Sequence, residues 1–177
     1  MTERIIIAGA GGQGIMLSGK ILAEAAMQEG KCVTWLPAYG PEVRGGTAYC
    51  MVIISDSQIG SPYITEADTL IILNGLSFQK FKSRVKKNGL IIANSSFELG
   101  VSQKGARSLR YPFTDLAIKQ GNVKVANMIA LGSYLGYKTI IATKTIFETI
   151  RRMAPADKKE LIEINRQAFM QGLRLAQ

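Results

Sequence analysis

Six residues near the start of the chain have the types and spacing of an anion-binding loop. They read Gly-Ala-Gly-Gly-Gln-Gly and supply the candidate contact residues Gly9, Gly11, Gly12, Gln13 and Gly14. Glycines allow a tight turn and a close approach of the backbone to a ligand, and a helix that starts there presents unpaired N–H groups to an anion. The same glycines also suit a loop that only turns the chain and lets a helix pack on a strand. The spacing therefore leaves a phosphate contact and a packed turn open.

The flanking sequence predicts a strand before this loop and a helix after it. Residues 4–8 form an apolar run that ends at glycine, as in a buried strand. From Ile15 to Gln28 apolar residues recur every three or four positions, which indicates an amphipathic helix, and Gly30 is its expected C-terminal cap. Residues 32–36 are predicted to form a second strand that stops at Pro37. These segments predict a β–loop–α–β unit with a right-handed crossover.

A dinucleotide-binding site requires more than the glycines. Such sites carry an Asp or Glu about 20 residues further on, at the end of the second strand, to hold a ribose hydroxyl. That position falls near Trp35-Leu36-Pro37, where there is no acid, and no Arg follows immediately to take a 2′-phosphate. The loop is not a P-loop either, because no Gly-Lys-Ser/Thr closes it. A free-standing nucleotide-binding oxidoreductase is therefore the alternative interpretation and not the leading one.

A second glycine-rich segment follows the second predicted strand, at the edge of the sheet where α/β folds place their sites. It covers residues 38–46 and supplies the candidates Tyr39, Arg44, Gly45 and Gly46. Arg44 can make a bidentate contact with a carboxylate or phosphate, or it can pair locally with Glu42. Tyr39 can stack on a flat group or simply hold the loop in place.

The rest of the chain alternates strands and helices and then becomes helical. Strands are predicted at residues 47–55, 69–73, 90–94 and 107–111, with a short basic helix at 78–87 and a turn at Asn88-Gly89. Later helices are predicted at 114–119, 125–135, 143–153 and 157–175, the first and last capped by Thr114 and Asp157. The alternation predicts an α/β fold, a Rossmann-like open and mostly parallel sheet flanked by helices, with extra C-terminal helices. No internal repeat or linker is visible, so we expect a single domain over residues 1–177.

The chain carries few residues suited to catalysis. It has no histidine, which excludes Ser-His-Asp and Cys-His catalysis and histidine-based metal sites. Cys32 and Cys50 lie in apolar segments and are predicted to be buried, inert thiols, and two are too few for an iron–sulfur cluster. We therefore predict no catalytic residue and no metal site. Asn127 opens an apolar helix, where core packing is the first expectation and a subunit contact or polar role the second.

The formal net charge of +9 favours an acidic or phosphate-rich partner. The basic residues are spread along the chain, and no basic platform interleaved with aromatic residues is visible, so a nucleic-acid-binding module is a third and weaker interpretation. No apolar run approaches the roughly 18 residues needed to cross a bilayer, and the first apolar run is a strand and not a signal peptide. We expect a cytoplasmic protein without membrane or nucleic-acid partners.

Taken together, the motifs resemble the gamma subunit of 2-oxoacid:ferredoxin oxidoreductases. The resemblance rests on the two glycine-rich segments and covers nearly the whole chain. It continues through Leu22–Ala26, Ile54–Asp56, Gly89–Ser95, Ala126–Gly132 and the last helix with Leu161, Asn165 and Ala168. The Tyr-Gly-Pro-Glu-x-Arg-Gly-Gly version of the second segment is closer to the 2-oxoglutarate and 2-ketoisovalerate members than to the pyruvate members.

The resemblance implies a subunit that is inactive alone, in a complex that oxidatively decarboxylates a 2-oxoacid to its acyl-coenzyme A and passes electrons to ferredoxin. In that family thiamine diphosphate is held by the alpha and beta subunits, and the iron–sulfur clusters sit on other subunits or domains. The implied partners are the alpha and beta subunits, a delta subunit where one exists, and ferredoxin indirectly. We expect no cofactor to be bound by this chain alone. In the complex, coenzyme A contact is expected at the two glycine-rich segments and Asn127, together with a part in assembly.

Overall fold

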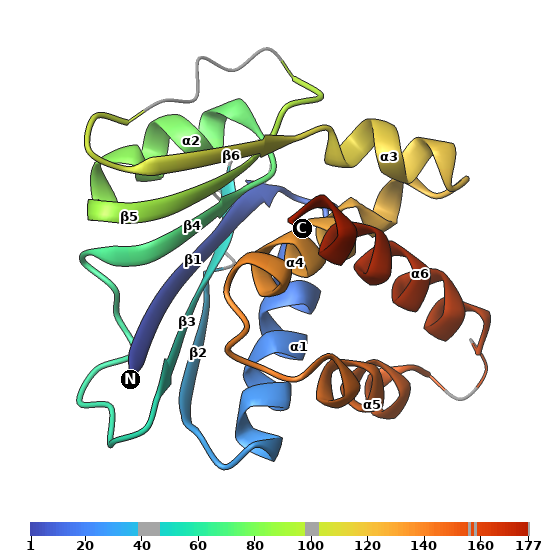
Figure 1. Cartoon of the computed structure of the whole chain (residues 1–177), viewed down its shortest axis with the longest axis horizontal. Coiled ribbons are helices and arrows are strands. Elements are labelled where there is room, and N and C mark those ends of the chain that lie inside the picture. The colour runs from blue at the N-terminus through green and yellow to red at the C-terminus, as the bar shows by residue number, and fades with distance from the viewer. Residues whose placement is uncertain (39–46, 98–102, 156, 158, 177) are drawn as a thin grey trace.

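Figure 1 shows a six-stranded sheet with helices packed on both of its faces. This computed structural model describes residues 1–38, 47–97, 103–155, 157 and 159–176. Its strands are β1 (Thr2–Ala10), β2 (Cys32–Ala38), β3 (Thr47–Ser55), β4 (Ala67–Ile72), β5 (Val85–Asn94) and β6 (Arg107–Tyr111). Its helices are α1 (Ile15–Gln28), α2 (Gly75–Phe81), η2 (Lys82–Arg84), α3 (Phe113–Lys119), η3 (Val123–Val125), α4 (Ala126–Tyr137), α5 (Thr143–Met153) and α6 (Glu160–Leu175).

The strand order in the sheet is β2-β3-β1-β4-β5-β6. β1, β4, β5 and β6 pair in parallel, whereas β3 runs antiparallel to both of its neighbours, β1 and β2. Five strands therefore point in one direction, which confirms the open and mostly parallel α/β sheet. The two strands of the predicted β–loop–α–β unit are not neighbours, because β3 lies between them.

Both faces of the central strands are buried, so these strands are apolar at nearly every position. Ile5 and Ile7 of β1 face α1 and α4, and the intervening Ile6 faces Phe78 and Phe81 of α2 on the other side of the sheet. All three isoleucines are at most 1% exposed. This two-sided burial is the reason why the first apolar run of the chain has no polar alternation.

The C-terminal helices add a layer over the α1 face of the sheet, as Figure 1 shows. Helices α4 and α6 cross closely because each contributes a glycine at the crossing. A Cβ atom on Gly172 would collide with the backbone oxygen of Ile129, and one on Gly132 with the backbone oxygen of Phe169. No helix in the described part of the chain is both long and apolar enough to cross a membrane.

Three predicted boundaries within the sheet region are wrong for tertiary reasons. Pro37 lies inside β2 and does not end it, which is tolerated because β2 is an edge strand with one side free of ladder hydrogen bonds. The helix predicted at 78–87 ends at Phe81, and after η2 the chain enters β5 at Val85. The predicted Asn88-Gly89 turn lies within β5, where Asn88 has a positive φ of 64°.

The two predicted N-caps are also wrong. Helix α3 begins at Phe113, and the backbone N–H of Thr114 donates to the side chain of Asn94 (3.4 Å). Helix α6 begins at Glu160, three residues after Asp157. In contrast, the predicted bounds of α1, α5, β3 and β6 agree with the structure.

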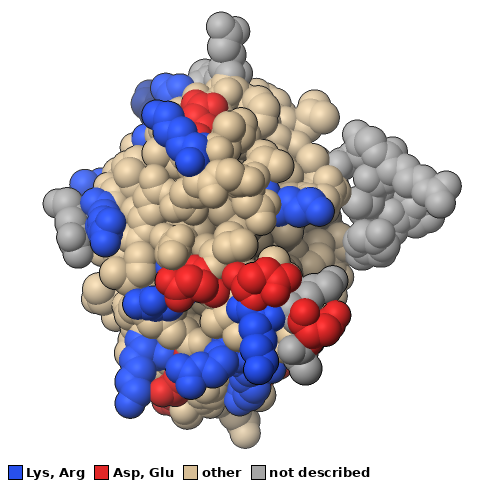
Figure 2. All heavy atoms as spheres, turned by 90° about the vertical axis from the view of Figure 1, so that its right-hand side faces the viewer, with Lys and Arg blue, Asp and Glu red and all other residues tan. Residues whose placement is uncertain are grey.

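Charged side chains of both signs share the face formed by α3, α5 and α6, which Figure 2 shows. Arg166 pairs with Glu163 (3.1 Å) and Lys144 with Glu148 (3.9 Å). Basic residues on this face are therefore interleaved with acidic ones.

Candidate functional site

The glycine loop lies at the carboxyl edge of the sheet, where β1 ends and α1 begins. From β1 the chain crosses to β2 on one side, while β4, the parallel neighbour of β1, lies on the other side. The strands that follow β1 in the sequence thus lie first on one side of it, as β2 and β3, and then on the other, as β4, β5 and β6. In open α/β sheets, ligands bind in the crevice outside the carboxyl ends of the strands at such a switch point.

Gln13 closes the loop on itself. Its side-chain oxygen Oε1 accepts a hydrogen bond from the backbone N–H of Ala10 (2.7 Å), and its own N–H donates to the Ala10 carbonyl (3.3 Å). Gly12 and Gly14 have φ angles of 85° and 70°, in the left-handed region that favours glycine. The loop is therefore a built turn, and the Gln13 side chain is engaged in holding it.

Asn127 holds the loop from the start of α4. The residue is 2% exposed, and its Nδ2 donates to the carbonyl oxygen of Gly14 (2.9 Å), while its Oδ1 accepts from the N–H of Met128 (2.9 Å). A Cβ atom on Gly14 would collide with this carboxamide. Asn127 thus packs in the core, as first expected, and in addition fixes the position of the loop through a polar contact.

Helix α1 starts directly after this loop without a side-chain cap. Its first backbone hydrogen bond within the helix runs from the N–H of Ser18 to the carbonyl of Gly14 (3.1 Å), and no side chain caps the helix. The N–H groups of the first turn therefore lack helical partners. Gly11 and Gly12, which precede Gln13 and the N-cap residue Gly14, are exposed. A positive helix end that follows exposed glycines has the chemistry of an anion site.

Two asparagines without a function predicted from the sequence organise the neighbouring strand ends. Asn74 follows β4 and caps α2, accepting a hydrogen bond from the N–H of Ser77 (2.9 Å). Asn94 ends β5, is fully buried, and donates to the Leu73 carbonyl (3.3 Å) and the Thr114 hydroxyl (2.8 Å). An asparagine directly after an apolar run is the signal that could have identified both as residues of the carboxyl edge.

The second glycine-rich segment falls largely outside the described residues. Tyr39, Arg44, Gly45 and Gly46 all lie in the range 39–46, which the structure does not describe. The residue that follows the range is described: Thr47 pairs with Ala10, the last residue of β1. The chain therefore re-enters the sheet directly beside the glycine loop.

The two cysteines occupy opposite ends of the β2–β3 pair. Cys50 is fully buried as predicted, with its Sγ 3.6 Å from the carbonyl of Ile15, and burial raises the pKa of its thiol to about 12. Cys32 is only half-buried, so the prediction of a buried thiol is wrong there. Cys32 pairs with Ser55 and Cys50 with Pro37 in the strand register, which keeps the thiols apart. Within the described ranges, no three His, Cys, Asp or Glu side chains gather as metal ligands would.

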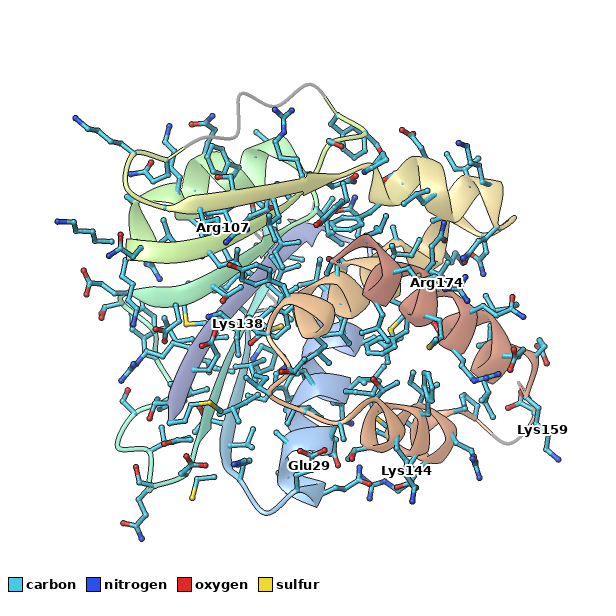
Figure 3. All side chains as sticks on the ribbon, in the orientation of Figure 1. Glu29, Arg107, Lys138, Lys144, Lys159 and Arg174 are labelled. Atoms are coloured by element: carbon cyan, nitrogen blue, oxygen red, sulfur yellow. The ribbon has the colours of Figure 1, made fainter. Side chains whose placement is uncertain are left out.

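A buried carboxylate at the other end of β1 joins α4 to the sheet. Glu3 is 7% exposed, and its Oε1 accepts hydrogen bonds from the hydroxyl of Thr69 (2.7 Å) and from Nζ of Lys138 (2.7 Å), which Figure 3 labels. The hydroxyl of Tyr134 lies 3.4 Å from the same oxygen, and burial together with this carboxylate raises the pKa of Tyr134. This cluster has its charges paired, so it stabilises the packing of α4 and presents no reactive group.

Comparison with known proteins gives one consistent result. The family described as pyruvate ferredoxin/flavodoxin oxidoreductase matches residues 4–175. Ketoisovalerate oxidoreductase subunit VorA from Methanothermobacter thermautotrophicus is 35% identical over 98% of this chain and 36% of its own length. 2-Oxoglutarate synthase subunit KorC from Archaeoglobus fulgidus is 34% identical over 97% of this chain and 88% of its own length. The chain thus spans about a third of the VorA relative and most of the KorC relative.

Two solved structures share the fold over nearly the whole chain. The gamma subunit of a keto/oxoacid ferredoxin oxidoreductase from Geobacter sulfurreducens has a TM-score of 0.85 and 29% identity, covering 98% of both chains. The 2-oxoglutarate:ferredoxin oxidoreductase from Magnetococcus marinus, solved with 2-oxoglutarate, coenzyme A and succinyl-CoA bound, has a TM-score of 0.89 and 25% identity. This chain covers 31% of the Magnetococcus chain, of which it resembles one part.

Proposed function

Because the chain belongs to the pyruvate ferredoxin/flavodoxin oxidoreductase family, we propose that it is the gamma subunit of a multi-subunit 2-oxoacid:ferredoxin oxidoreductase. The complex converts a 2-oxoacid and coenzyme A into an acyl-coenzyme A, carbon dioxide and a proton, and it passes the two electrons that are released to ferredoxin. Its substrate class is 2-oxoglutarate or a branched-chain 2-oxoacid, since relatives named for 2-oxoglutarate and ketoisovalerate are both about one-third identical to the chain. The family match supports this interpretation and not a free-standing nucleotide-binding oxidoreductase.

We assign the redox cofactors of the complex to its other subunits. An iron–sulfur cluster normally takes four thiolates, whereas this chain has two cysteines, one of them Cys50 with its raised pKa. The described residues therefore do not fit an iron–sulfur cluster. The partners that carry thiamine diphosphate and the clusters are the alpha and beta subunits, with a delta subunit where one exists. We place the complex in the cytoplasm and treat the chain as a single domain within it.

The contribution of this chain to chemistry is a contact with the phosphates of coenzyme A at the glycine loop. One observation carries this proposal: the exposed Gly11 and Gly12 lead into the uncapped start of α1 at the switch point of the sheet. Gln13 and Asn127 act as positioning residues, because their carboxamides hold Ala10 and Gly14 in place. Coenzyme A carries several phosphates, so a helix N-terminus and a cationic chain suit it.

A matched pair of substitutions at Gly12 tests the contact. Gly12 has a φ of 85°, and a Cβ atom there would meet nothing within 4 Å. Asn and Asp have similar shapes and both tolerate the left-handed region, so Gly12→Asn and Gly12→Asp differ mainly in charge. In the assembled complex, Gly12→Asp should raise the KM for coenzyme A about tenfold over Gly12→Asn, equivalent to about 1.4 kcal/mol of repulsion. The KM for the 2-oxoacid should be the same in both variants.

Equal KM values for coenzyme A in the two variants would show that the loop does not contact coenzyme A and is only a packed turn. Arg44→Ala provides a second measurement, because the sequence predicts a phosphate or carboxylate contact for this guanidinium. We expect a higher KM for coenzyme A or a weaker assembly of the complex. If the KM and the assembly of the complex are both unchanged, Arg44 contributes only to its own loop.

Membership in the complex is tested separately from coenzyme A contact. A tagged chain, expressed together with the subunits encoded beside it, should retain them through purification at a fixed stoichiometry. A chain that stays free of them while binding NAD(H) or NADP(H) saturably in calorimetry would instead support the alternative function.

A further inference from the structure

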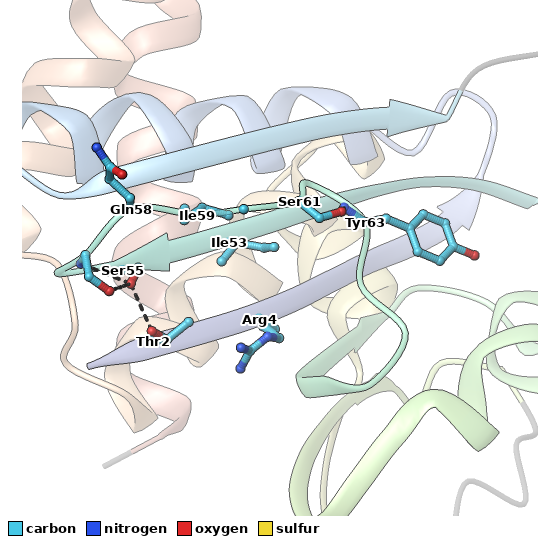
Figure 4. A pocket seen from close by; sticks show the side chains of 10 residues that line it. Thr2, Arg4, Ile53, Ser55, Gln58, Ile59, Ser61 and Tyr63 are labelled. Atoms are coloured by element: carbon cyan, nitrogen blue, oxygen red, sulfur yellow. Dashed lines mark hydrogen bonds between the residues drawn. The ribbon is translucent and has the colours of Figure 1, made fainter.

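A pocket of about 410 Å³ lies at the amino edge of the sheet, at the other end of β1 from the glycine loop (Figure 4). Thr2 and Arg4 of β1 and Ile53 and Ser55 of β3 line one side of it, and the segment 57–61 that follows β3 lines the other. Arg4, the last pocket residue on β1, and Gly9, the first residue of the glycine loop, are five positions apart on this strand, which is about 17 Å at about 3.3 Å per residue. The pocket is therefore distinct from the proposed coenzyme A contact.

Hydroxyl groups line the pocket, and those of Thr2, Ser55 and Ser57 form a chain of hydrogen bonds. The Thr2 and Ser55 hydroxyl oxygens lie 2.9 Å apart, as the dashed line in Figure 4 marks, and the Ser55 and Ser57 oxygens lie 3.3 Å apart. The hydroxyl of Tyr63 accepts a hydrogen bond from Nη2 of Arg84 (2.9 Å). A hydroxyl that accepts one bond still has a proton to donate. The wall of the pocket is thus suited to a ligand that accepts hydrogen bonds.

Arg4 is the one charged side chain among the described residues that line the pocket. Its Nη1 lies 3.7 Å from Oδ2 of Asp68, a long ion pair, and Asp68 is also bound by Lys86 and by the backbone N–H of Arg4. Lys86 therefore compensates much of the Asp68 charge, and a guanidinium with five N–H donors keeps several for another acceptor. Asp56, between Ser55 and Ser57, is held by Lys31 (2.7 Å). The charge presented to a ligand in the pocket is positive.

We propose that this pocket binds a small organic oxyanion, with its carboxylate or phosphate group on Arg4 and the hydroxyls. Arg4 supplies the charge and a planar fork that matches either group. Ile53 and Ile59 supply apolar contact for a short carbon segment of the ligand. The volume is within the range of small-molecule sites, toward its lower end. The ligand is therefore a small metabolite, bound at a site separate from that of coenzyme A.

Succinate and inorganic phosphate are suitable probes for this site, and each tests one of the two anion chemistries. An isotope-labelled full chain, titrated with either probe and followed by NMR, should show saturable shifts confined to the start of β1, the end of β3 and residues 57–63. Saturation with succinate alone assigns a carboxylate ligand, and saturation with phosphate alone assigns a phosphate ester. If neither probe produces localised, saturable shifts, the proposal is wrong.

Charge-matched variants distinguish a site from general attraction to a cationic chain. Arg4→Gln should weaken binding at least tenfold, the effect expected for loss of a charge-assisted hydrogen bond. Arg4→Lys keeps the charge but loses the fork, so it should weaken binding less. Lys144→Gln removes the same charge from an 87% exposed side chain on α5, labelled in Figure 3, and should leave binding within about twofold. Equal weakening by Arg4→Gln and Lys144→Gln, with both variants folded by circular dichroism, would overturn the proposal.

Discussion

Replacement of Gly14 by alanine tests how α4 fixes the glycine loop. Gly14 has a φ of 70°, and an added Cβ would lie 2.9 Å from Cγ of Asn127 and closer still to its Nδ2. Left-handed backbone costs an L-residue roughly 1–2 kcal/mol. Displacing the buried Asn127 carboxamide from the Gly14 carbonyl costs a further 1–3 kcal/mol or so, since the amide then lacks its partner. Gly14→Ala should therefore destabilise the chain by about 3 kcal/mol.

Gly12→Ala is the matched control. Its φ of 85° imposes the same kind of backbone strain, but a Cβ atom there meets no neighbour within 4 Å. The cost is then the strain alone, roughly 1–2 kcal/mol. For a chain of this length about 1 kcal/mol corresponds to about 2–4 °C in Tm, so the two variants should differ by several degrees.

Urea denaturation gives the free energy of unfolding of both variants. It is followed by circular dichroism and by the fluorescence of Trp35, the single tryptophan. The double variant Gly14→Ala/Asn127→Ala adds the decisive comparison. Once the Asn127 side chain is absent the collision is relieved, so the effects of the two substitutions should be less than additive. If Gly14→Ala is no more destabilising than Gly12→Ala, or if the double variant is additive, then Asn127 does not fix the loop.

The remaining predictions concern packing and the buried thiol. Gly172→Ala should lower the free energy of unfolding by about 1–3 kcal/mol, because its methyl group would overlap the Ile129 carbonyl where α4 and α6 cross. Arg174→Ala, at an exposed position of the same helix, should change the free energy of unfolding by no more than about 0.5 kcal/mol in the same urea assay. Iodoacetamide should leave Cys50 unmodified in the folded chain and alkylate it after unfolding, and modification of folded Cys50 detected by mass spectrometry would contradict its burial. Burial raises the pKa of Cys50 from 9.0 to about 12. Above pH 9 the thiol of the unfolded chain therefore loses its proton while that of the folded chain keeps it. The free energy of unfolding should then fall by up to about 1.4 kcal/mol per pH unit until about pH 12. Cys50→Ala should remove that part of the slope, and an unchanged slope in urea titrations at pH 8–11 would refute the assignment.

Local patterns in the sequence were sufficient for several elements of the fold. The bounds of α1 follow from apolar spacing and from Gly30, which has a φ of 75° and follows the C-cap residue Glu29. The insertion of β3 between β1 and β2 could not be predicted in this way, because strand order depends on pairing between distant segments. Pro37 is tolerated in β2 for the same kind of reason: its position at the edge of the sheet is a tertiary property.

The candidate site was only partly predictable. The glycine pattern located the loop, since left-handed positions such as Gly12 and Gly14 favour that residue. The hydrogen bond from Asn127 to Gly14 joins residues 113 positions apart, and no local pattern encodes it. The engagement of Gln13 with Ala10 was likewise hidden, because a glutamine in a loop has the same sequence signature whether it faces a ligand or its own backbone.

The most direct test of the proposed function is reconstitution of the activity. The isolated chain, the partner subunits without it, and the complete complex are each assayed for 2-oxoacid- and coenzyme A-dependent reduction of an artificial electron acceptor. We predict that the isolated chain is inactive and that adding it to the partner subunits raises acyl-coenzyme A formation to the level of the complete complex. Turnover by the isolated chain, or full activity of the partner subunits without it, would contradict the assignment of this protein as their gamma subunit.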